Sequence, residues 1–307
     1  MSKMINQEMM YMKPNRDLIF KAIFGDPRNI ILLESLLRSI LKFPYDDFKE
    51  LQLTNTELIA QKKNDKLGRL DVKLKMKNGR IVNIEIQVAK DMDMRERVTY
   101  YGTRLIADQL ASGEEYDELK PVVSIVIADY MLIPENEHYR NRYVLHDATT
   151  ESTFTDLLEI NTLELRKLPQ DSDGHLLWDW LSFLKAETEE DFKMVEKVNP
   201  EIKKAVAIVK ELSQDEQMRE EYEAREKALK DHNSRMKYFK NAEQTEQRAR
   251  EQGLKRGLEQ GRQEEREKAE IEKLAIVKNL INANIPACEI AKYTGLSVER
   301  IAHLISK

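Results

Sequence analysis

Two short segments, residues 69–75 and 84–88, alternate polar with aliphatic residues on either side of an Asn78-Gly79 turn. A period of two is typical of strands that bury one face, and Asn-Gly favours an antiparallel hairpin. We therefore expect Asp71 and Glu85 to lie close together at one edge of a buried sheet. Carboxylates held together need a cation between them, and a divalent metal ion is the usual one. The hairpin thus indicates metal-assisted phosphodiester hydrolysis.

Composition bounds the class of protein. The chain has 307 residues, of which 34% are charged, with a formal net charge of -5. This length predicts two domains, or one domain with an extended arm. The one cysteine, Cys288, excludes an internal disulfide framework and a thiolate zinc site. No apolar run resembles a signal peptide or a membrane span, so we expect a soluble, cytoplasmic protein with no membrane contact and no organic cofactor.

The first half of the chain mixes helical and strand periodicities. Helices are expected at residues 17–24, 30–41 and 92–112, and strands at residues 51–61, 122–128, 139–146 and 157–165, in addition to the hairpin. This order predicts an α/β domain over residues 1–170, with helices on both faces of a mixed sheet.

Strand signals vanish beyond that domain. Residues 171–213 predict a helical extension that packs on it, with helices at 176–185, 189–198 and 202–212. Residues 214–272 predict a charged helical arm, in which Gly253, Gly257 and Gly261 recur with a period of four. The arm is either a solvated spacer with many i,i+4 charge pairs or a surface on which two such helices associate closely.

Residues 273–307 regain a normal apolar pattern and predict three short helices. The spacing of Ala291, Gly295 and Ser297, followed by two aliphatic residues, is typical of a helix-turn-helix unit. Five Lys or Arg residues oppose two Glu residues there, a local net charge of +3, which favours DNA. Arg300 would then lie on the recognition helix. The alternative is a small helical cap for oligomerisation.

The hairpin offers a set of hard oxygen ligands. Two carboxylates, Asp71 and Glu85, and the backbone carbonyl of Ile86 would satisfy a divalent cation. Gln87 can position a water molecule but cannot supply a positive charge, so Lys73 or Lys21 would have to supply it. The alternative is that both carboxylates lie on the solvated face of an ordinary sheet.

Several short motifs occur in a fixed order around the hairpin. They are residues 15–21 (NRDLIFK), 66–72 (KLGRLDV), 83–87 (NIEIQ), 97–101 (RVTYY) and 113–121, which ends in Leu119-Lys120-Pro121. This ordered set resembles the PD-(D/E)XK nuclease family transposases, the Rpn recombination-promoting nucleases. The resemblance covers about residues 13–170 and the glycine-punctuated charged tail.

The resemblance implies a restriction-endonuclease-like fold that cleaves DNA with Mg2+, or with Mn2+, and acts in recombination or mobile-element biology. It assigns Asp71, Glu85 and Gln87 to the D…E-x-(K/Q) signature, and Asp17 to an acidic position on the first helix. The family tolerates glutamine where the wider superfamily has lysine. Double-stranded DNA and a second copy of the chain, in a homodimer, are the implied partners.

Arginines near the hairpin are candidates for phosphate contacts. Arg69 precedes Asp71, while Arg97 and Arg104 lie on the helix that follows. Such contacts confer affinity without reading sequence. Alternatively, Arg97 and Arg104 lie on a solvated face of that helix and pair with acidic residues.

Two other functions fit the same residues. One is a catalytically silent DNA-binding scaffold, which the uncharged Gln87 favours. The other is a phage-defence or toxin-like effector that uses the same chemistry on another nucleic acid.

Overall fold

The protein is described by a computed structural model over residues 11–56, 71–90 and 93–305. The chain forms two compact units, Met1–Lys230 and Asp231–Lys307, which we describe separately.

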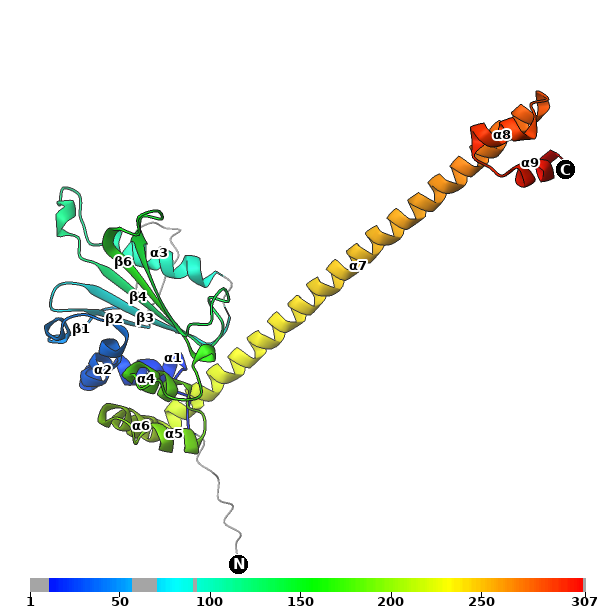
Figure 1. Cartoon of the computed structure of the whole chain (residues 1–307). Coiled ribbons are helices and arrows are strands. Elements are labelled where there is room, and N and C mark those ends of the chain that lie inside the picture. Colours follow the sequence, from blue (N-terminus) through cyan, green and yellow to red (C-terminus); the bar gives the residue numbers. More distant parts are fainter. Residues whose placement is uncertain (1–10, 57–70, 91–92, 306–307) are drawn as a thin grey trace, which may run out of the picture. The chain divides into compact units, whose positions relative to one another are not determined.

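A six-stranded mixed sheet organises the first unit (Figure 1). Its strands are β1 (Gln52–Leu53), β2 (Val72–Lys75), β3 (Ile81–Gln87), β4 (Val122–Ala128), β5 (Arg140–His146) and β6 (Thr153–Glu164). They lie in the order β1-β2-β3-β4-β6-β5, and β4 runs parallel to both of its neighbours while the other pairs are antiparallel. The expected α/β class with a mixed sheet is confirmed.

Helices cover both faces of this sheet, as predicted (Figure 1). One layer contains α1 (Asp17–Phe24), α2 (Ile30–Ile40), α4 (Leu176–Lys185), α5 (Glu189–Val195) and α6 (Pro200–Leu212); α3 (Met94–Ala107) covers the opposite face. Short 3-10 helices occupy Pro27–Asn29, Tyr45–Phe48, Tyr116–Glu118 and Leu165–Lys167. All seven residues of β4 are buried, because helices pack on both of its faces.

Side-chain alternation in β3 separates the two layers. Ile84 and Ile86 belong to the large core on the α1 side, whereas the intervening Glu85 faces α3. On that second face Val98 of α3 packs with Val126 of β4. The period of two in the sequence therefore assigns these residues to their layers correctly.

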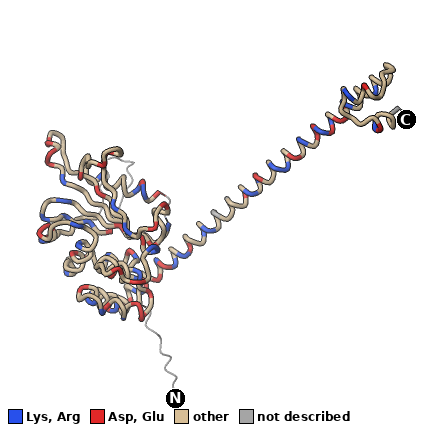
Figure 2. Tube along the Cα trace, viewed as in Figure 1, with Lys and Arg blue, Asp and Glu red and all other residues tan. Residues whose placement is uncertain are grey.

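The second unit contains most of α7 (Glu216–Asn282), together with α8 (Ala287–Thr294) and α9 (Val298–Ile305). Lys and Arg alternate with Asp and Glu along α7 (Figure 2). Val277, Ile290 and Ile301 form a small core between the end of α7 and the two short helices. Gly295 ends α8 with a φ of 66°, the left-handed conformation that glycine adopts without strain.

Several predicted boundaries are wrong, and the helix expected to reach residue 112 ends at Ala107. The first strand ends at Leu53, and residues 54–56 are not part of the sheet, while residues 57–61 lie outside the described residues. The helix expected within residues 273–307 is the end of α7, because no proline interrupts the chain between residues 216 and 282 and isolated glycines do not break a helix. Within the described residues, no helix is long and apolar enough to cross a membrane.

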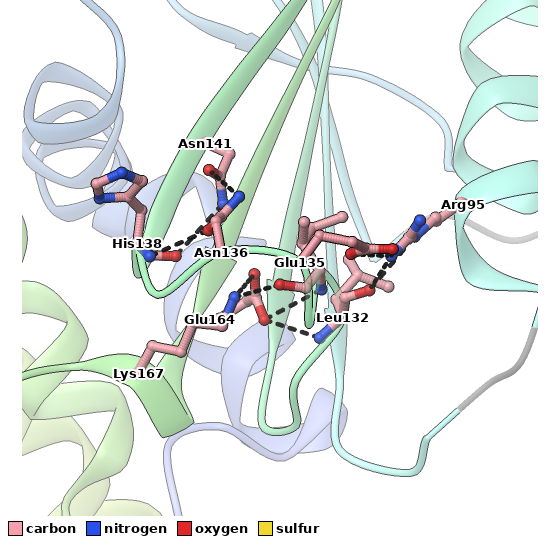
Figure 3. A network of polar contacts seen from close by, with 9 residues as sticks. Arg95, Leu132, Glu135, Asn136, His138, Asn141, Glu164 and Lys167 are labelled. Carbon is pink, nitrogen blue, oxygen red and sulfur yellow. Dashed lines mark hydrogen bonds and ion pairs between the residues drawn. The ribbon is translucent and has the colours of Figure 1, made fainter.

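A buried ion pair fixes the loop after β4 (Figure 3). The side chains of Glu164 and Lys167 are 0% and 4% exposed, and Nζ of Lys167 lies 2.9 Å from Oε1 of Glu164. The other carboxylate oxygen accepts hydrogen bonds from the N–H groups of Leu132 and Ile133. Glu164 thus joins the end of β6 to this loop.

We expect Glu164→Ala to lower the free energy of unfolding of the first unit by about 3–5 kcal/mol, since it leaves the buried Lys167 ammonium without its carboxylate. Urea denaturation followed by tryptophan fluorescence reports this change, because Trp180 is buried in the core of this unit. Glu135→Ala is the matched control: Glu135 pairs with Arg95 in the same network but is exposed. Equal effects of the two substitutions would contradict the prediction.

Candidate active site

Asp71 directly precedes β2, and Gln87 ends β3. Val72 pairs with Ile84, so one further step along the ladder places Asp71 opposite Glu85. The Asp71 carboxylate turns toward the end of β3, where Oδ2 accepts a hydrogen bond of 2.8 Å from the backbone N–H of Ile86. The Asp71 side chain thereby satisfies the Ile86 N–H in place of a backbone carbonyl at the start of β2.

Helix α1 brings a cation to this carboxylate. Ile19, Phe20 and Ile23 of α1 are buried in the core, which leaves Asp17 and Lys21 on the side of the helix that faces the strand ends. Nζ of Lys21 lies 2.8 Å from Oδ1 of Asp71 and 3.8 Å from Oδ2 of Asp17. The ammonium therefore neutralises Asp71 and lies between two carboxylates.

A cavity of about 260 Å3 opens beside these residues. It is lined by Asp17, Asp71, Ile86 and Gln87, and by Arg225 and Glu226 from the first part of α7. All of these residues belong to the first unit. The cavity is therefore the place where four of the six predicted catalytic and metal-binding residues meet.

Glu85 and Lys73 lie on the other face of the sheet. Glu85 is 1% exposed, and its Oε2 lies 3.3 Å from a terminal nitrogen of Arg97 on α3. Partial burial lowers the pKa of Lys73, and the nearby Asp108, at the end of α3, opposes this shift. Lys21, and not Lys73, is consequently the lysine beside Asp71.

The other predicted arginines that the structure describes contact acidic residues. Besides Arg97, the buried Arg104 has its Nε 3.5 Å from a carboxylate oxygen of Asp108. In the second unit Arg300 lies 2.8 Å from Glu270. Arg69 lies outside the described residues.

Sequence reasoning missed the contribution of α7. Arg16 donates to both carboxylate oxygens of Glu226, and NH1 of Arg225 donates to Oδ2 of Asp17 at 2.7 Å. The sequence did contain a signal for this contact. Within the charged run, the apolar residues Met218, Tyr222 and Leu229 recur at helical spacing and face the rest of the first unit.

Asp129 extends the polar cluster to the neighbouring strand. It follows β4, and its N–H donates to the carbonyl of Gln87 at 2.8 Å. Its carboxylate lies 2.7 Å from Arg166 and accepts a hydrogen bond from Asn15. Burial raises the pKa of Asp129 in spite of the Arg166 charge, so its carboxyl is harder to ionise in the folded state than in the unfolded chain.

The donor set suits a hard divalent cation in kind, since it consists of carboxylate and carbonyl oxygens. Among the described residues, no group of three or more His, Cys, Asp or Glu side chains is arranged to hold a metal ion. Asp71 is instead balanced by Lys21, and Glu85 by Arg97. Both carboxylates therefore already have a cationic side chain as partner.

A mixed sheet that carries acidic residues where β2 starts and β3 ends defines a restriction-endonuclease-like core. The chain belongs to the PD-(D/E)XK nuclease family transposases, whose family model matches residues 14–239. This confirms the resemblance found in the sequence motifs and supports a nuclease or transposase-like role. The match extends past residue 170 and includes Arg225 and Glu226. Searches of curated proteins and of solved structures returned no match.

Asp129 gives a testable pH dependence. Its raised pKa means that the folded state binds a proton more tightly than the unfolded state, so its contribution to stability falls as the pH rises above about 4. We expect Asp129→Asn to gain stability relative to the wild type between pH 4 and pH 7, as measured by urea midpoints.

Asp147→Asn is the control with the opposite sign. Hydrogen bonds from the Thr150 and Thr149 N–H groups lower the pKa of Asp147, so the wild type should keep a constant advantage over this variant between pH 4 and pH 7 and lose it as the pH falls below about 4. If both variants followed the same trend, the burial argument for Asp129 would be wrong.

Proposed function

We propose that the protein is a metal-dependent endonuclease that hydrolyses phosphodiester bonds of double-stranded DNA. The observation that carries this proposal is the contact between the Asp71 carboxylate and the Ile86 N–H, in a cavity that Asp17 and Gln87 also line. This contact joins Asp71, the first part of the family signature, to the Glu85–Gln87 segment, its second part, at the ends of neighbouring strands. Within this family, such an activity would serve DNA recombination or mobile elements.

Asp71, Glu85 and the carbonyl of Ile86 are the residues that would hold Mg2+ or Mn2+, and Glu85, which lies on the α3 face against Arg97, would have to turn toward the strand end to join the other two. In an extended strand the N–H and C=O of one residue point toward the same neighbouring strand. Because the Ile86 N–H reaches Asp71, its carbonyl is directed to the same side. When bound there, a divalent cation supplies Lewis-acid polarisation of a phosphoryl oxygen and makes a water molecule more acidic.

Lys21 supplies the positive charge that Gln87 lacks. Its ammonium is already beside Asp71, and it can donate hydrogen bonds to a phosphate oxygen brought into the cavity. The Gln87 side-chain amide can accept a hydrogen bond from a water molecule and so orient it. Asp17 holds Lys21 from the opposite side, which keeps the ammonium near the strand ends.

The second unit would add DNA affinity. Its helices α8 and α9 are joined by the left-handed Gly295, as in a helix-turn-helix unit, and residues 273–307 carry a net charge of +3. Cleavage of both strands of a duplex would require two active sites, which favours a homodimer.

Asp71→Ala and Glu85→Ala should each reduce Mg2+-dependent nicking of supercoiled plasmid by more than about 100-fold, the upper range for residues that only support a metal ligand. The assay compares magnesium, manganese, calcium and EDTA. Circular dichroism confirms that each variant is folded. Undiminished nicking by either purified variant would refute the assignment.

Lys21→Met and Lys73→Met form a matched pair, since each keeps the aliphatic stem and removes one charge. We expect Lys21→Met to slow nicking by about 100-fold, as for loss of one donor to a developing negative charge, and Lys73→Met to remain close to the wild type. The reverse order of effects would show that the charge comes from the α3 face of the sheet.

A catalytically silent DNA-binding scaffold is the second candidate. Lys21 and Arg97 balance Asp71 and Glu85 without a metal ion, which is what a silent site requires. In that case the purified wild-type protein would retain DNA and show no nicking with any of the metal ions.

A further inference from the structure

The first turns of α7 form a fixed wall of the active-site cavity. Tyr222 is 4% exposed and packs in the main core of the first unit. Its hydroxyl accepts a hydrogen bond of 3.2 Å from the backbone N–H of Lys13. The position of this part of α7 is therefore set by burial and by a specific bond.

A second contact sets the rotation of the helix about its axis. The Arg16 guanidinium donates two hydrogen bonds to the Glu226 carboxylate, and the two side chains are only 14% and 19% exposed. Such fork-shaped pairs fix orientation as well as distance. Because Arg16 immediately precedes α1, this pair joins the start of α1 to α7 next to Asp17.

Arg225 is thereby directed at the cavity. Its NH1 donates to Oδ2 of Asp17 at 2.7 Å and its NH2 donates to Oε1 of Glu221 at 2.5 Å. The side chain is 46% exposed, in contrast to its neighbour Glu226. A guanidinium has five N–H donors in a planar fork that matches phosphate oxygens, so it can bind an anion from solvent while it keeps part of its present contacts.

The charges of the cavity show why such a residue is needed. Three carboxylates line it, those of Asp17, Asp71 and Glu226, against two guanidiniums. Arg16 is buried against Glu226 and Lys21 lies against Asp71, so both of these cations have carboxylate partners. Arg225 is the more exposed of the two arginines that line the cavity.

A purely structural role explains Arg225 poorly. Half-exposed ion pairs contribute little to stability, and Tyr222 and Glu226 already hold α7 in place. The ion pairs of Arg225 with Asp17 and Glu221 are of this half-exposed kind.

We propose that Arg225 binds a phosphate group of the substrate DNA in the cavity of Asp71 and Gln87. This inference rests on the proposed nuclease function, since it treats that cavity as the place where the phosphodiester enters. The arm of the protein then contributes a substrate contact to the nuclease core.

The test compares Arg225→Ala with Lys227→Ala, a matched control that removes one positive charge from an exposed position two residues away on α7. Binding of a fluorescein-labelled DNA duplex is measured by anisotropy in EDTA, over a series of salt concentrations, so that no cleavage is needed. We expect Arg225→Ala to weaken binding by about 10- to 100-fold, as for loss of a charged hydrogen bond. The slope of log affinity against log salt should fall by about 0.9.

Two further variants separate contact from structure. Arg225→Lys should recover part of the affinity, because it restores the charge without the planar fork. Arg225→Gln keeps amide donors for Asp17 and Glu221, and should bind DNA as weakly as the alanine variant while its thermal unfolding matches the wild type. If the alanine variant is unstable, the DNA affinity of Arg225→Gln decides whether Arg225 contacts DNA.

Plasmid nicking by the wild-type protein, run alongside, keeps the two proposals distinguishable. If the wild type nicks DNA and Arg225→Ala binds the duplex as well as Lys227→Ala does, the role of Arg225 is refuted and the nuclease function stands. A specific loss of binding in Arg225→Ala with no nicking by the wild type would support the phosphate contact and refute the nuclease function.

Discussion

The fold around the cavity depends on how the Asp71 carboxylate is satisfied. One oxygen accepts the N–H of Ile86 at the end of β3, and the other meets the ammonium of Lys21 on α1. These two contacts join the start of one strand, the end of the next and the first helix at one point. A carboxylate that is 11% exposed requires both of them, since burying a charge without partners is costly.

Much of the core could be predicted because it follows from local periodicity. Alternation in residues 81–87 assigns Ile84 and Ile86 to one layer and Glu85 to the other, and the β-branched run at 122–128 forms the central buried strand. Local patterns failed at the start of α7. Tyr222 is buried against residues about 200 positions earlier in the chain, and the surrounding charged residues obscure the apolar stripe that it shares with Met218 and Leu229.

The candidate site was predictable in composition but not in geometry. Asp71 lies one residue before β2, so strand alternation does not determine where its carboxylate points. It turns to Lys21, whereas Glu85, inside β3, remains on the α3 face with Arg97. The sequence offered Lys73 or Lys21 for the missing charge and favoured Lys73, and only the packing of α1 against the sheet places Lys21 beside Asp71. The glutamine in the signature therefore does not exclude a positive charge beside Asp71, because Lys21 of α1 provides one.

The continuity of α7 has a consequence for dissecting the protein. The composition changes near residue 214, which suggests a place to cut, but the helix continues without a break from Glu216 to Asn282. A fragment that ended at residue 213 would lose Tyr222 from its core and Glu226 from its contact with Arg16. A self-sufficient fragment of the first unit must therefore end inside α7, beyond Leu229. Fragments that end beyond this residue are the ones in which the first unit can be studied apart from the second.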